Sequence, residues 1–323
     1  MAGKKILLEA RDLVKEFALE GGKKGKNVVH AVSGVNLRIY EGETLALVGE
    51  SGCGKSTLGR TLIKLIEATS GTIEFDGTDI TRMKDREFTE IRRQMQIIFQ
   101  DPYASLNPRM NVREIISEPL TTHGLARTKD EIESQVKALM DEVGIPREFI
   151  NRYPHQFSGG QRQRIGIARA IALHPRLIIC DEPVSALDVS IQSQVLNLLK
   201  DLQEQYQLTY LFISHDLSVV KYVSDRIAVM YLGRIVEIAT KDELYNNPQH
   251  PYTKALLSAI PIPDVDNKMK REILTGDVPS PLNPPAGCYF HTRCRYASER
   301  CSAECPKLHD IGNGHMVSCH LCE

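Results

Sequence analysis

The sequence predicts an α/β fold built on a mixed sheet, with a small cysteine-rich extension at its C-terminal end. Three observations support this prediction. Apolar, β-branched segments alternate with helical segments, as in parallel sheets. A glycine-rich loop, Gly49–Thr57, joins one of these strands to a helix. Six of the eight cysteines fall within residues 288–322, which sets the C-terminal end apart from the α/β body.

The first third of the chain is rich in predicted strands and contains one helix. We expect strands at Ile6–Leu13, Val28–Tyr40 and Glu43–Val48, because these segments carry β-branched and apolar residues. They predict an antiparallel N-terminal part. After the glycine-rich loop, apolar residues recur at helical spacing from Lys55 to Ile66, and Gly71–Asp76 has the pattern of a further strand.

The middle of the chain predicts a helical insert on the α/β body. Residues 86–173 are mostly amphipathic helix, and the helical subdomain is expected at about residues 100–160. A parallel sheet is indicated by the short apolar strands, which are separated by helical segments. The expected elements are the strands Met95–Phe99, Leu177–Cys180 and Tyr210–Ser214 and the helix Val189–Gln205.

The last third predicts a hairpin, two short helices and a linker. Ile227–Ile238 has the pattern of a hairpin turning at Gly233, and Thr240 with Glu243 is typical of a capping box. A helix is expected at Pro251–Ala259, and the proline-rich residues 261–285 predict an extended linker. The expected domains are residues 1–260 and residues 261–323.

Composition excludes several classes of function. A hydrophobic content of 42%, with 25% charged residues, is that of an ordinary folded protein. The net charge of -1 disfavours a nucleic-acid partner. The N-terminal apolar run ends at Glu9, so we expect no signal peptide, and no segment approaches the roughly 20 apolar residues of a spanning helix. A membrane would be reached through partner chains.

The glycine-rich loop predicts a nucleotide phosphate site. Its pattern lies between a strand and a helix, where successive backbone N–H groups and the helix N-terminus face the phosphates. Lys55 would reach the β and γ phosphates, and Ser56 would offer a hydroxyl group to Mg²⁺. The residues expected to bind ATP in this loop are Gly49, Ser51, Gly52, Cys53, Gly54, Lys55, Ser56 and Thr57.

Two carboxylates follow the apolar strand that ends at Cys180. Ligands of open α/β sheets bind at the carboxyl ends of the strands. Asp181 is expected to hold Mg²⁺, and Glu182 to polarise the water that attacks the γ-phosphate. Cys53 and Cys180 themselves are expected to be small buried residues without a catalytic role.

A second serine-glycine turn separates this chain from other phosphate-loop proteins. Phe157-Ser-Gly-Gly-Gln-Arg-Gln-Arg164 resembles the signature of the ABC transporter ATPases, a family of phosphate-loop NTPases. The resemblance implies that MgATP is sandwiched between two such subunits, with this turn facing the ATP of the opposing subunit. The residues implied are Ser158, Gly159, Gly160 and Gln161.

Other positions match the family in the same order. The resemblance implies that Gln100 senses Mg²⁺ and the attacking water while linking to the membrane subunits, and that His215 contacts the γ-phosphate. It implies that Asp188 helps to form the dimer seam, and Phe17 is similar to the aromatic residue that stacks on adenine. For Phe17 a core aromatic is the alternative. The catalytic residues are thus expected to be Glu182, His215 and Gln100, with Mg²⁺ held by Ser56, Gln100 and Asp181.

Two segments narrow the resemblance within the family. Gln100–Pro108 and Asn247–Thr253 look like the ATP-binding subunits of dipeptide and oligopeptide importers, and the likeness runs from about Leu8 to Cys319. It implies a peripheral protein at the cytoplasmic face of the membrane. The implied partners are two permease subunits, a second homologous ATPase or a second copy of this chain, and an extracytoplasmic peptide-binding protein. Close relatives carry nickel or other solutes, so the cargo stays open.

The cysteine cluster predicts a soft-metal site of uncertain type. Its spacing matches neither zinc ribbons nor bacterial ferredoxins. The resemblance implies that the C-terminal region of these importers holds an iron-sulfur cluster of the [4Fe-4S] type. Zinc and free or oxidised thiols are the alternatives, and Cys305 or Cys322 could substitute for a neighbour. The implied ligands are Cys288, Cys294, Cys301 and Cys319.

Two rival functions expect other features. An ABC ATPase acting on DNA would place a long coiled coil before the signature, and a ribosomal one would carry two ATPase domains in one chain. The sequence predicts neither feature. A non-catalytic regulatory subunit is disfavoured because Glu182 and His215 are both present.

Overall fold

The computed structural model of the chain describes residues 4–19, 28–260, 274 and 276–323. The chain divides into two compact units, which are described separately below. Unit 1 comprises Met1–Arg82 and Ser214–Glu323, and unit 2 comprises Met83–Ile213. Most of the first half of the predicted linker, residues 261–273 and 275, lies outside the described residues, so the predicted domain boundary at residue 260 stays a prediction.

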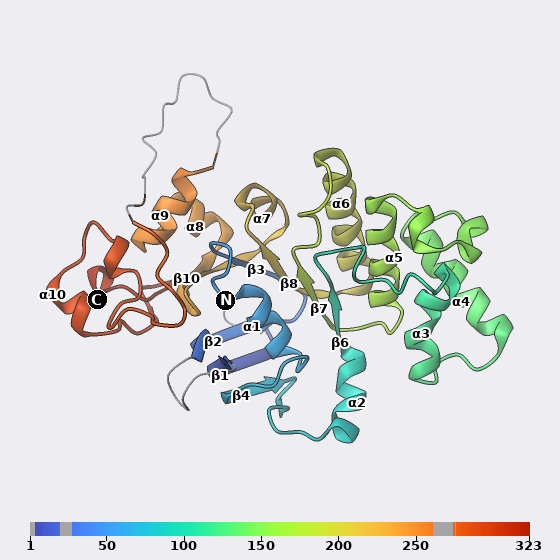
Figure 1. The fold of residues 1–323 in the computed structure, drawn as a ribbon, viewed down its shortest axis with the longest axis horizontal. Helices are drawn as coiled ribbons and strands as arrows, with labels where there is room; N and C mark the ends of the chain where they lie inside the picture. The colour runs from blue at the N-terminus through green and yellow to red at the C-terminus, as the bar shows by residue number, and fades with distance from the viewer. Residues whose placement is uncertain (1–3, 20–27, 261–273, 275) are drawn as a thin grey trace. The chain divides into compact units, whose positions relative to one another are not determined.

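The N-terminal part of unit 1 is an antiparallel sheet in the order β2-β1-β4-β5 (Figure 1). The strand β1 was expected to end at Leu13 but continues to Ala18. The polar pair Arg11-Asp12 breaks the apolar pattern. The strand accommodates it through a register shift, at which Asp12 has a φ of 47°. The strands are β1 (Ile6–Ala18), β2 (Val28–Tyr40), β4 (Ser70–Phe75) and β5 (Thr78–Asp79).

Unit 1 also contains the strand that leads into the glycine-rich loop. This strand, β3 (Thr44–Val48), is fully buried and pairs in parallel with β9 (Arg226–Tyr231). β9 turns back into β10 (Arg234–Thr240) through Leu232 and Gly233, which both have positive φ values of 43° and 80°. Two positive φ values are typical of a two-residue hairpin turn, so the predicted hairpin is confirmed.

The helices of unit 1 are short. The helix α1 ends at Leu62, one turn before the predicted Ile66, because the chain leaves the helical conformation at Lys64, whose φ is 56°. The predicted cap at Thr240 is confirmed, since its hydroxyl oxygen accepts a hydrogen bond from the N–H of Glu243. The helices of the body are α1 (Lys55–Leu62), α7 (Leu217–Val223), α8 (Lys241–Asn246) and α9 (Pro251–Ser258).

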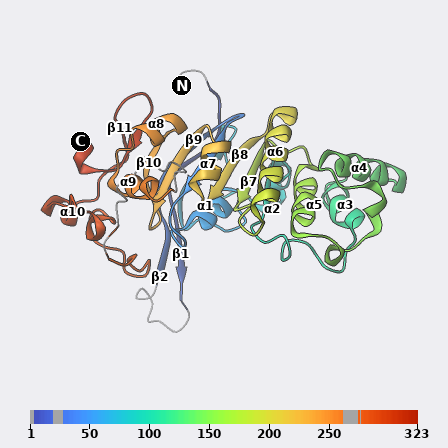
Figure 2. The same cartoon turned by 90° about the horizontal axis from the view of Figure 1, so that it is seen from above.

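The C-terminal residues of unit 1 pack onto its body. The strand β12 (Met316–Val317) pairs antiparallel with β10, so the orange and red segments lie beside each other in Figures 1 and 2. Phe290 is 2% exposed and belongs to the same apolar cluster as Tyr231 and Tyr252. The remaining elements are η3 (His291–Arg293), α10 (Glu299–Ala303), β11 (His309–Asp310) and η4 (His320–Cys322).

Unit 2 combines parallel strands with the predicted helical insert. Its strands follow the order β8-β7-β6, and each neighbouring pair is parallel. β7 and β8 are buried along their whole length, as expected of strands covered on both faces. The strands are β6 (Met95–Ile98), β7 (Leu177–Asp181) and β8 (Thr209–Ser214), the last residue of β8 being the first of the second segment of unit 1.

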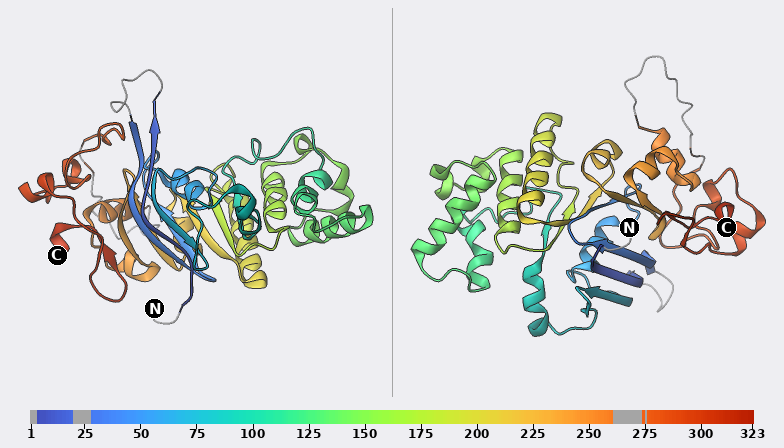
Figure 3. Two further views of the ribbon diagram at one scale, coloured as in Figure 1. Left: turned by 90° about the horizontal axis from the view of Figure 1, so that it is seen from below. Right: turned by 180° about the vertical axis from the view of Figure 1, so that it is seen from behind.

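The helices α3, α4 and α5 of unit 2 gather in one group, drawn in green in Figures 1 and 3. The predicted helical insert is therefore confirmed. The helices of this unit are α2 (Asp85–Gln94), α3 (Val112–Thr122), α4 (Lys129–Glu142), η1 (Arg147–Asn151), η2 (Pro154–Gln156), α5 (Gly159–Ile171) and α6 (Val189–Tyr206). Within the part of the chain that the structure describes, no helix has the length and apolar character needed to cross a bilayer.

Candidate functional site

The glycine-rich loop of unit 1 connects β3 to α1, as predicted, and its glycines are required by close backbone contacts. Gly49 has a φ of 155°, and a Cβ atom there would lie 2.2 Å from the carbonyl oxygen of Met230. Gly54 has a φ of 104°, and its Cβ would lie 2.0 Å from the carbonyl oxygen of Ala31. Only glycine fits both positions. The loop is thus packed tightly against the hairpin and β2.

Lys55, the first residue of α1, is folded back over this loop. Its side chain is buried, and Nζ donates hydrogen bonds to the carbonyl oxygens of Gly49 at 2.8 Å and Glu50 at 3.0 Å. These two bonds hold the ammonium group at the centre of the loop, where a phosphate group would face it. Burial raises the pKa of the neighbouring Cys53 thiol, in keeping with its expected structural role.

The sequence patterns did not indicate a role for Glu50, but the fold places two distant residues in contact with it. Its N–H donates to the phenol oxygen of Tyr252 at 2.9 Å, and its carboxylate accepts two hydrogen bonds from Arg293 at 2.8 and 3.2 Å. These partners lie 202 and 243 residues away in the sequence. No local pattern could have indicated them; the only sequence signal was the position of Arg293 beside a cysteine.

The two other predicted site residues in unit 1, His215 and Phe17, are exposed to solvent. His215 follows β8 directly and is exposed. The residue before it, Ser214, accepts a hydrogen bond from the N–H of Asp216 at 3.0 Å, and Asp216 caps α7. Phe17 lies near the end of β1 with 38% of its surface exposed, and Lys15 Nζ lies 4.7 Å from its ring centroid. An exposed ring is available for stacking on a base.

In unit 2 the fold brings together three of the predicted site residues. Asp181 is the last residue of β7 and is fully buried. Glu182 follows with a φ of 49°, a conformation that costs a non-glycine residue energy, and its N–H donates to Ile213 O at 3.1 Å. Gln100 Nε2 donates to the carboxylate of Glu182 at 3.0 Å. A carboxylate oriented by an amide at the end of a buried strand can polarise a water molecule.

The signature turn, Ser158 to Gln161, begins the helix α5 through a capping box. Ser158 Oγ accepts from the N–H of Gln161 at 3.3 Å, and the Gln161 side chain accepts from the N–H of Ser158 at 3.1 Å. Gly160 has no room for a side chain, since a Cβ would lie 2.4 Å from Cγ2 of Ile191 in α6. Gly159 is less crowded, with 3.4 Å to Leu187. The turn is therefore packed against the start of α6.

Asp188 is the N-cap of α6. Its carboxylate accepts hydrogen bonds from the N–H of Ile191 at 3.1 Å and the hydroxyl of Ser190 at 2.8 Å, and these bonds hold its pKa below the usual range. A further contact was missed in the sequence. The guanidinium of Arg162 lies 3.6 Å from the ring centroid of Tyr103, which joins the segment after Gln100 to the signature helix.

The four cysteines predicted to bind a cluster are gathered in unit 1. The N–H of Cys288 donates to Cys301 O at 2.8 Å. Burial raises the pKa of Cys288 to about 11, and the nearby thiols of Cys301 and Cys294 add to this shift. Burial also raises the pKa of Cys319 to about 12, with Cys322, Cys288 and Cys294 contributing. Four cysteine thiols are a donor set of the kind that soft metals prefer.

The two additional cysteines have different surroundings. Cys305 is exposed and its Sγ accepts a hydrogen bond from Arg234 at 3.1 Å, whereas Cys322 lies beside Cys319. Among the described residues, which include all six cysteines of this region, no three cysteine, histidine, aspartate or glutamate side chains form a group that could hold a metal ion. The donor set is present, but the structure does not show a formed metal site.

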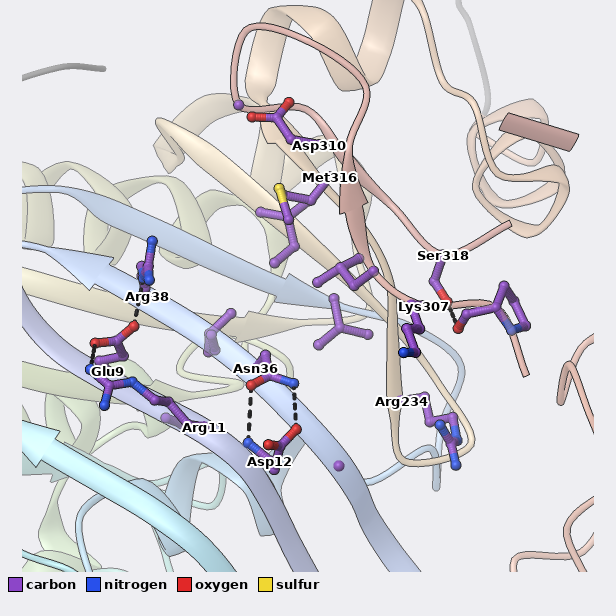
Figure 4. Close-up of a pocket in the computed structure, with 18 of the residues that line it drawn as sticks. Glu9, Arg11, Asp12, Asn36, Arg38, Arg234, Lys307, Asp310, Met316 and Ser318 are labelled. Atoms are coloured by element: carbon purple, nitrogen blue, oxygen red, sulfur yellow. Dashed lines mark hydrogen bonds and ion pairs between the residues drawn. The ribbon is translucent and has the colours of Figure 1, made fainter. Parts of the chain in front are cut away.

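A cavity of about 890 Å³ lies elsewhere in unit 1, next to β1, β2, β10 and the C-terminal strands. None of the glycine-rich loop residues lines it. Figure 4 shows Glu9 between Arg11 and Arg38, which both donate to its carboxylate at 2.6 Å, and Asp12 facing Asn36. Because no residue predicted to bind ATP lines this cavity, it is not the predicted nucleotide site.

Comparison with known proteins places these features in one family. The ABC transporter family matches residues 32–185, and the oligopeptide/dipeptide transporter C-terminal region matches residues 236–301. The chain is 55% identical over 322 residues to the oligopeptide transport ATP-binding protein OppF of Salmonella typhimurium, covering 98% of this chain and 96% of the relative. It belongs to the oligopeptide ABC transporter ATPases. This oligopeptide transporter ATPase is also 52% identical over 325 residues to AppF of Bacillus subtilis, with 99% and 98% covered.

Solved structures agree with the fold of this oligopeptide transporter ATPase. A dimeric ATP-binding cassette, MJ0796, in a post-hydrolysis state bound to ADP and Pi, is 30% identical with a TM-score of 0.65. The match covers 73% of this chain and 99% of the cassette. The predicted ABC-type fold, with its mixed sheet, antiparallel N-terminal part and helical insert, is therefore confirmed. This comparison does not confirm the cysteine-rich extension, which stays a prediction.

Proposed function

We propose that this chain is the ATP-hydrolysing subunit of an ABC importer for dipeptides or oligopeptides. The observation that carries the proposal is its identity of 55% with an oligopeptide transport ATP-binding protein over nearly the whole of both chains. The match to the oligopeptide/dipeptide transporter C-terminal region supports the same cargo class. Nickel or another solute is the alternative cargo, and an ABC ATPase that is not linked to transport is the alternative activity.

The proposed chemistry assigns separate roles to each predicted residue. Lys55 and the loop N–H groups would bind the phosphates, and Ser56, Gln100 and Asp181 would hold Mg²⁺. Glu182 polarises the attacking water, and its hydrogen bond with Gln100 supports this role because it orients the carboxylate. His215 contacts the γ-phosphate. Phosphoryl transfer depends mainly on positioning and charge stabilisation, which these groups supply.

The active form is proposed to be a dimer of ATPase subunits with two MgATP molecules between them. Ser158, Gly159, Gly160 and Gln161 would face the ATP of the opposing subunit, Asp188 would form part of the seam, and Phe17 would stack on adenine. The dimeric state of the related cassette bound to ADP and Pi supports this arrangement. The second subunit is a homologous ATPase or another copy of this chain.

The remaining partners follow from the transporter family. Two permease subunits would span the membrane, an extracytoplasmic peptide-binding protein would deliver the cargo, and this chain would lie on the cytoplasmic face. Tyr103, stacked against Arg162 of the signature helix, lies in the segment expected to meet the permeases. A contact there could transmit movement from the permease to the signature turn.

We also propose a [4Fe-4S] cluster held by Cys288, Cys294, Cys301 and Cys319, with zinc as the alternative. Four cysteine thiolates are the usual ligands of such a cluster. The backbone hydrogen bond from Cys288 to Cys301, and the packing of Cys288 and Cys294 against one apolar cluster, support three members of this ligand set. A cluster there would cross-link the C-terminal region or respond to oxidation, and it would not take part in ATP hydrolysis. Cys305 is disfavoured as a ligand because it is exposed and bonded to Arg234.

Reconstituted transport tests the main proposal. The complete transporter, with its permeases and binding protein in liposomes, should take up a labelled tripeptide only when MgATP is supplied. The Glu182→Gln variant is the control: it should bind ATP with unchanged affinity but lose at least about 100-fold in turnover and uptake. Uptake of nickel without peptide would replace the proposed cargo, and undiminished hydrolysis by Glu182→Gln would contradict the assigned role of this carboxylate.

Metal analysis tests the second proposal. Anaerobically purified protein should contain iron and acid-labile sulfide in equal amounts and show a broad visible absorbance. Replacing Cys294 by serine should abolish both, whereas replacing the exposed Cys305 should leave them unchanged. Zinc without iron would favour the alternative metal, and protein without metal would contradict the proposal.

A further inference from the structure

Glu50, the second residue of the phosphate loop, is held from two directions by the C-terminal part of unit 1. Arg293 donates from Nη1 to Oε2 at 2.8 Å and from Nη2 to Oε1 at 3.2 Å, so the contact is bidentate. A bidentate pair fixes the orientation of the carboxylate as well as its distance. The backbone N–H of Glu50 donates to Tyr252 at 2.9 Å. The side chain and the backbone of this loop residue are thus both anchored outside the loop.

Arg293 is itself firmly placed. Its side chain is only 7% exposed, and it ends the short helix η3 that follows Phe290. The ring of Phe290 lies 5.3 Å from that of Tyr231 and 5.4 Å from that of Tyr252, centroid to centroid. Because these rings belong to the core of unit 1, they anchor the backbone that carries Arg293 beside Glu50.

The same part of the loop holds the lysine that is proposed to bind phosphate. Lys55 Nζ donates to the carbonyl oxygens of Gly49 and Glu50. A shift of Glu50 would therefore move an acceptor of the ammonium group and change where its charge lies. The contacts run from the C-terminal region through Arg293 to Glu50 and from Glu50 to Lys55.

We infer that Arg293 is a positioning residue for ATP binding, through which the cysteine-rich C-terminal region sets the conformation of the phosphate loop. The inference rests on the proposed function, because it assumes that the loop binds MgATP. Arg293 acts through Glu50 and is not itself a ligand of the nucleotide. The C-terminal region therefore helps to determine the conformation of the ATP site.

The chain offers a matched control at the opposite end of β3. Arg226 donates to Glu43, the residue before this strand, at 2.9 Å, and their side chains are 9% and 1% exposed. Loss of the arginine leaves a buried carboxylate at Glu43, which is 1% exposed, and a partly buried one at Glu50, which is 26% exposed, so both changes should lower stability. Only Arg293 adjoins the phosphate loop. A loss of ATP affinity confined to Arg293 variants therefore separates positioning from general destabilisation.

The experiment measures the Kd for MgATP by titration calorimetry and the Tm without nucleotide, using the full-length chain. Arg293→Gln should raise Kd about tenfold, an effect typical of residues that orient a binding group without contacting the ligand themselves. Arg293→Lys should raise it less, because it keeps the charge but loses the bidentate contact. Arg226→Gln should lower the Tm at least as much as Arg293→Gln, because Glu43 is the more buried carboxylate, and should leave Kd within about twofold of the wild-type value.

A double-mutant cycle completes the test. If Arg293 acts through Glu50, the combination of Glu50→Gln with Arg293→Gln should bind MgATP no more weakly than the weaker single variant. An unchanged Kd in Arg293→Gln, or an equal rise in Arg226→Gln, would overturn the inference alone. A wild-type chain that fails to bind MgATP would overturn the proposed function and this inference with it.

Discussion

Replacing Gly160 by alanine should destabilise unit 2 because the added methyl group has no room. A Cβ atom at this position would lie 2.4 Å from Cγ2 of Ile191, well inside the distance at which two carbon atoms repel. Overpacking of this kind costs about 1–3 kcal/mol in the free energy of unfolding. Part of this cost is offset by the better helix propensity of alanine, about 0.5–1 kcal/mol.

The same helix supplies a control for the propensity effect. Gly166 is also in α5, and a Cβ there would meet no atom within 4 Å. Gly166→Ala should therefore stabilise the protein by about 0.5–1 kcal/mol. The difference between the two alanine variants isolates the clash with Ile191 and should amount to about 1–3 kcal/mol.

Urea unfolding followed by far-ultraviolet circular dichroism measures these differences. Ile191→Ala removes the methyl group that blocks Gly160, so the double variant should be more stable than the sum of the two single effects predicts, by about 1–2 kcal/mol. Additive effects, or a Gly160→Ala variant as stable as Gly166→Ala, would refute the packing that we describe between the signature turn and α6.

Three further changes have defined outcomes. Lys55→Ala should weaken MgATP binding about 10- to 100-fold in calorimetry, because it removes charge-assisted hydrogen bonds to phosphate; equal affinity would contradict the site. Burial lowers the pKa of His250 to about 3, so the folded protein keeps it neutral while the unfolded chain binds a proton below about pH 6.5. Wild-type stability should therefore fall by about 1.4 kcal/mol per unit as pH drops from 6 towards 3, and His250→Asn, which can still cap the helix, should lack this component in urea unfolding. Glu237 is fully buried and accepts hydrogen bonds from the backbone of His250 and the ring of His315, so Glu237→Ala should cost about 3–5 kcal/mol, against at most about 0.5 kcal/mol for the exposed Glu304→Ala. Equal losses in the two variants would contradict a buried anchoring role.

Much of the fold was predictable because local chemistry determines it. The glycine spacing around Lys55 requires a strand before it and a helix after it, and the structure has both. The turn at Gly233 needs positive φ values, which favour glycine. The ends of elements were less predictable. The strand β1 passes Leu13 because a register shift accommodates Asp12, whose side chain bonds to Asn36 on the neighbouring strand.

The candidate site was predictable in its residues but not in its supports. The sequence predicts that Gln100 and Glu182 each follow an apolar strand, and the structure adds the pairing of these strands and the hydrogen bond between the two side chains. The contact of Arg293 with Glu50 joins residues 243 positions apart, and the clash that keeps Gly160 a glycine depends on Ile191 in another helix. Such contacts are set by tertiary packing, which leaves no periodic trace in the sequence.

The place of Phe290 in the core has a consequence for the order of events during synthesis. Its ring packs against both Tyr231 and Tyr252, and β12, still later in the chain, pairs with β10. Phe290 is synthesised after both tyrosines. The core of unit 1 can therefore close only once Phe290 has left the ribosome, and until then the growing chain exposes the aromatic surface of Tyr231 and Tyr252.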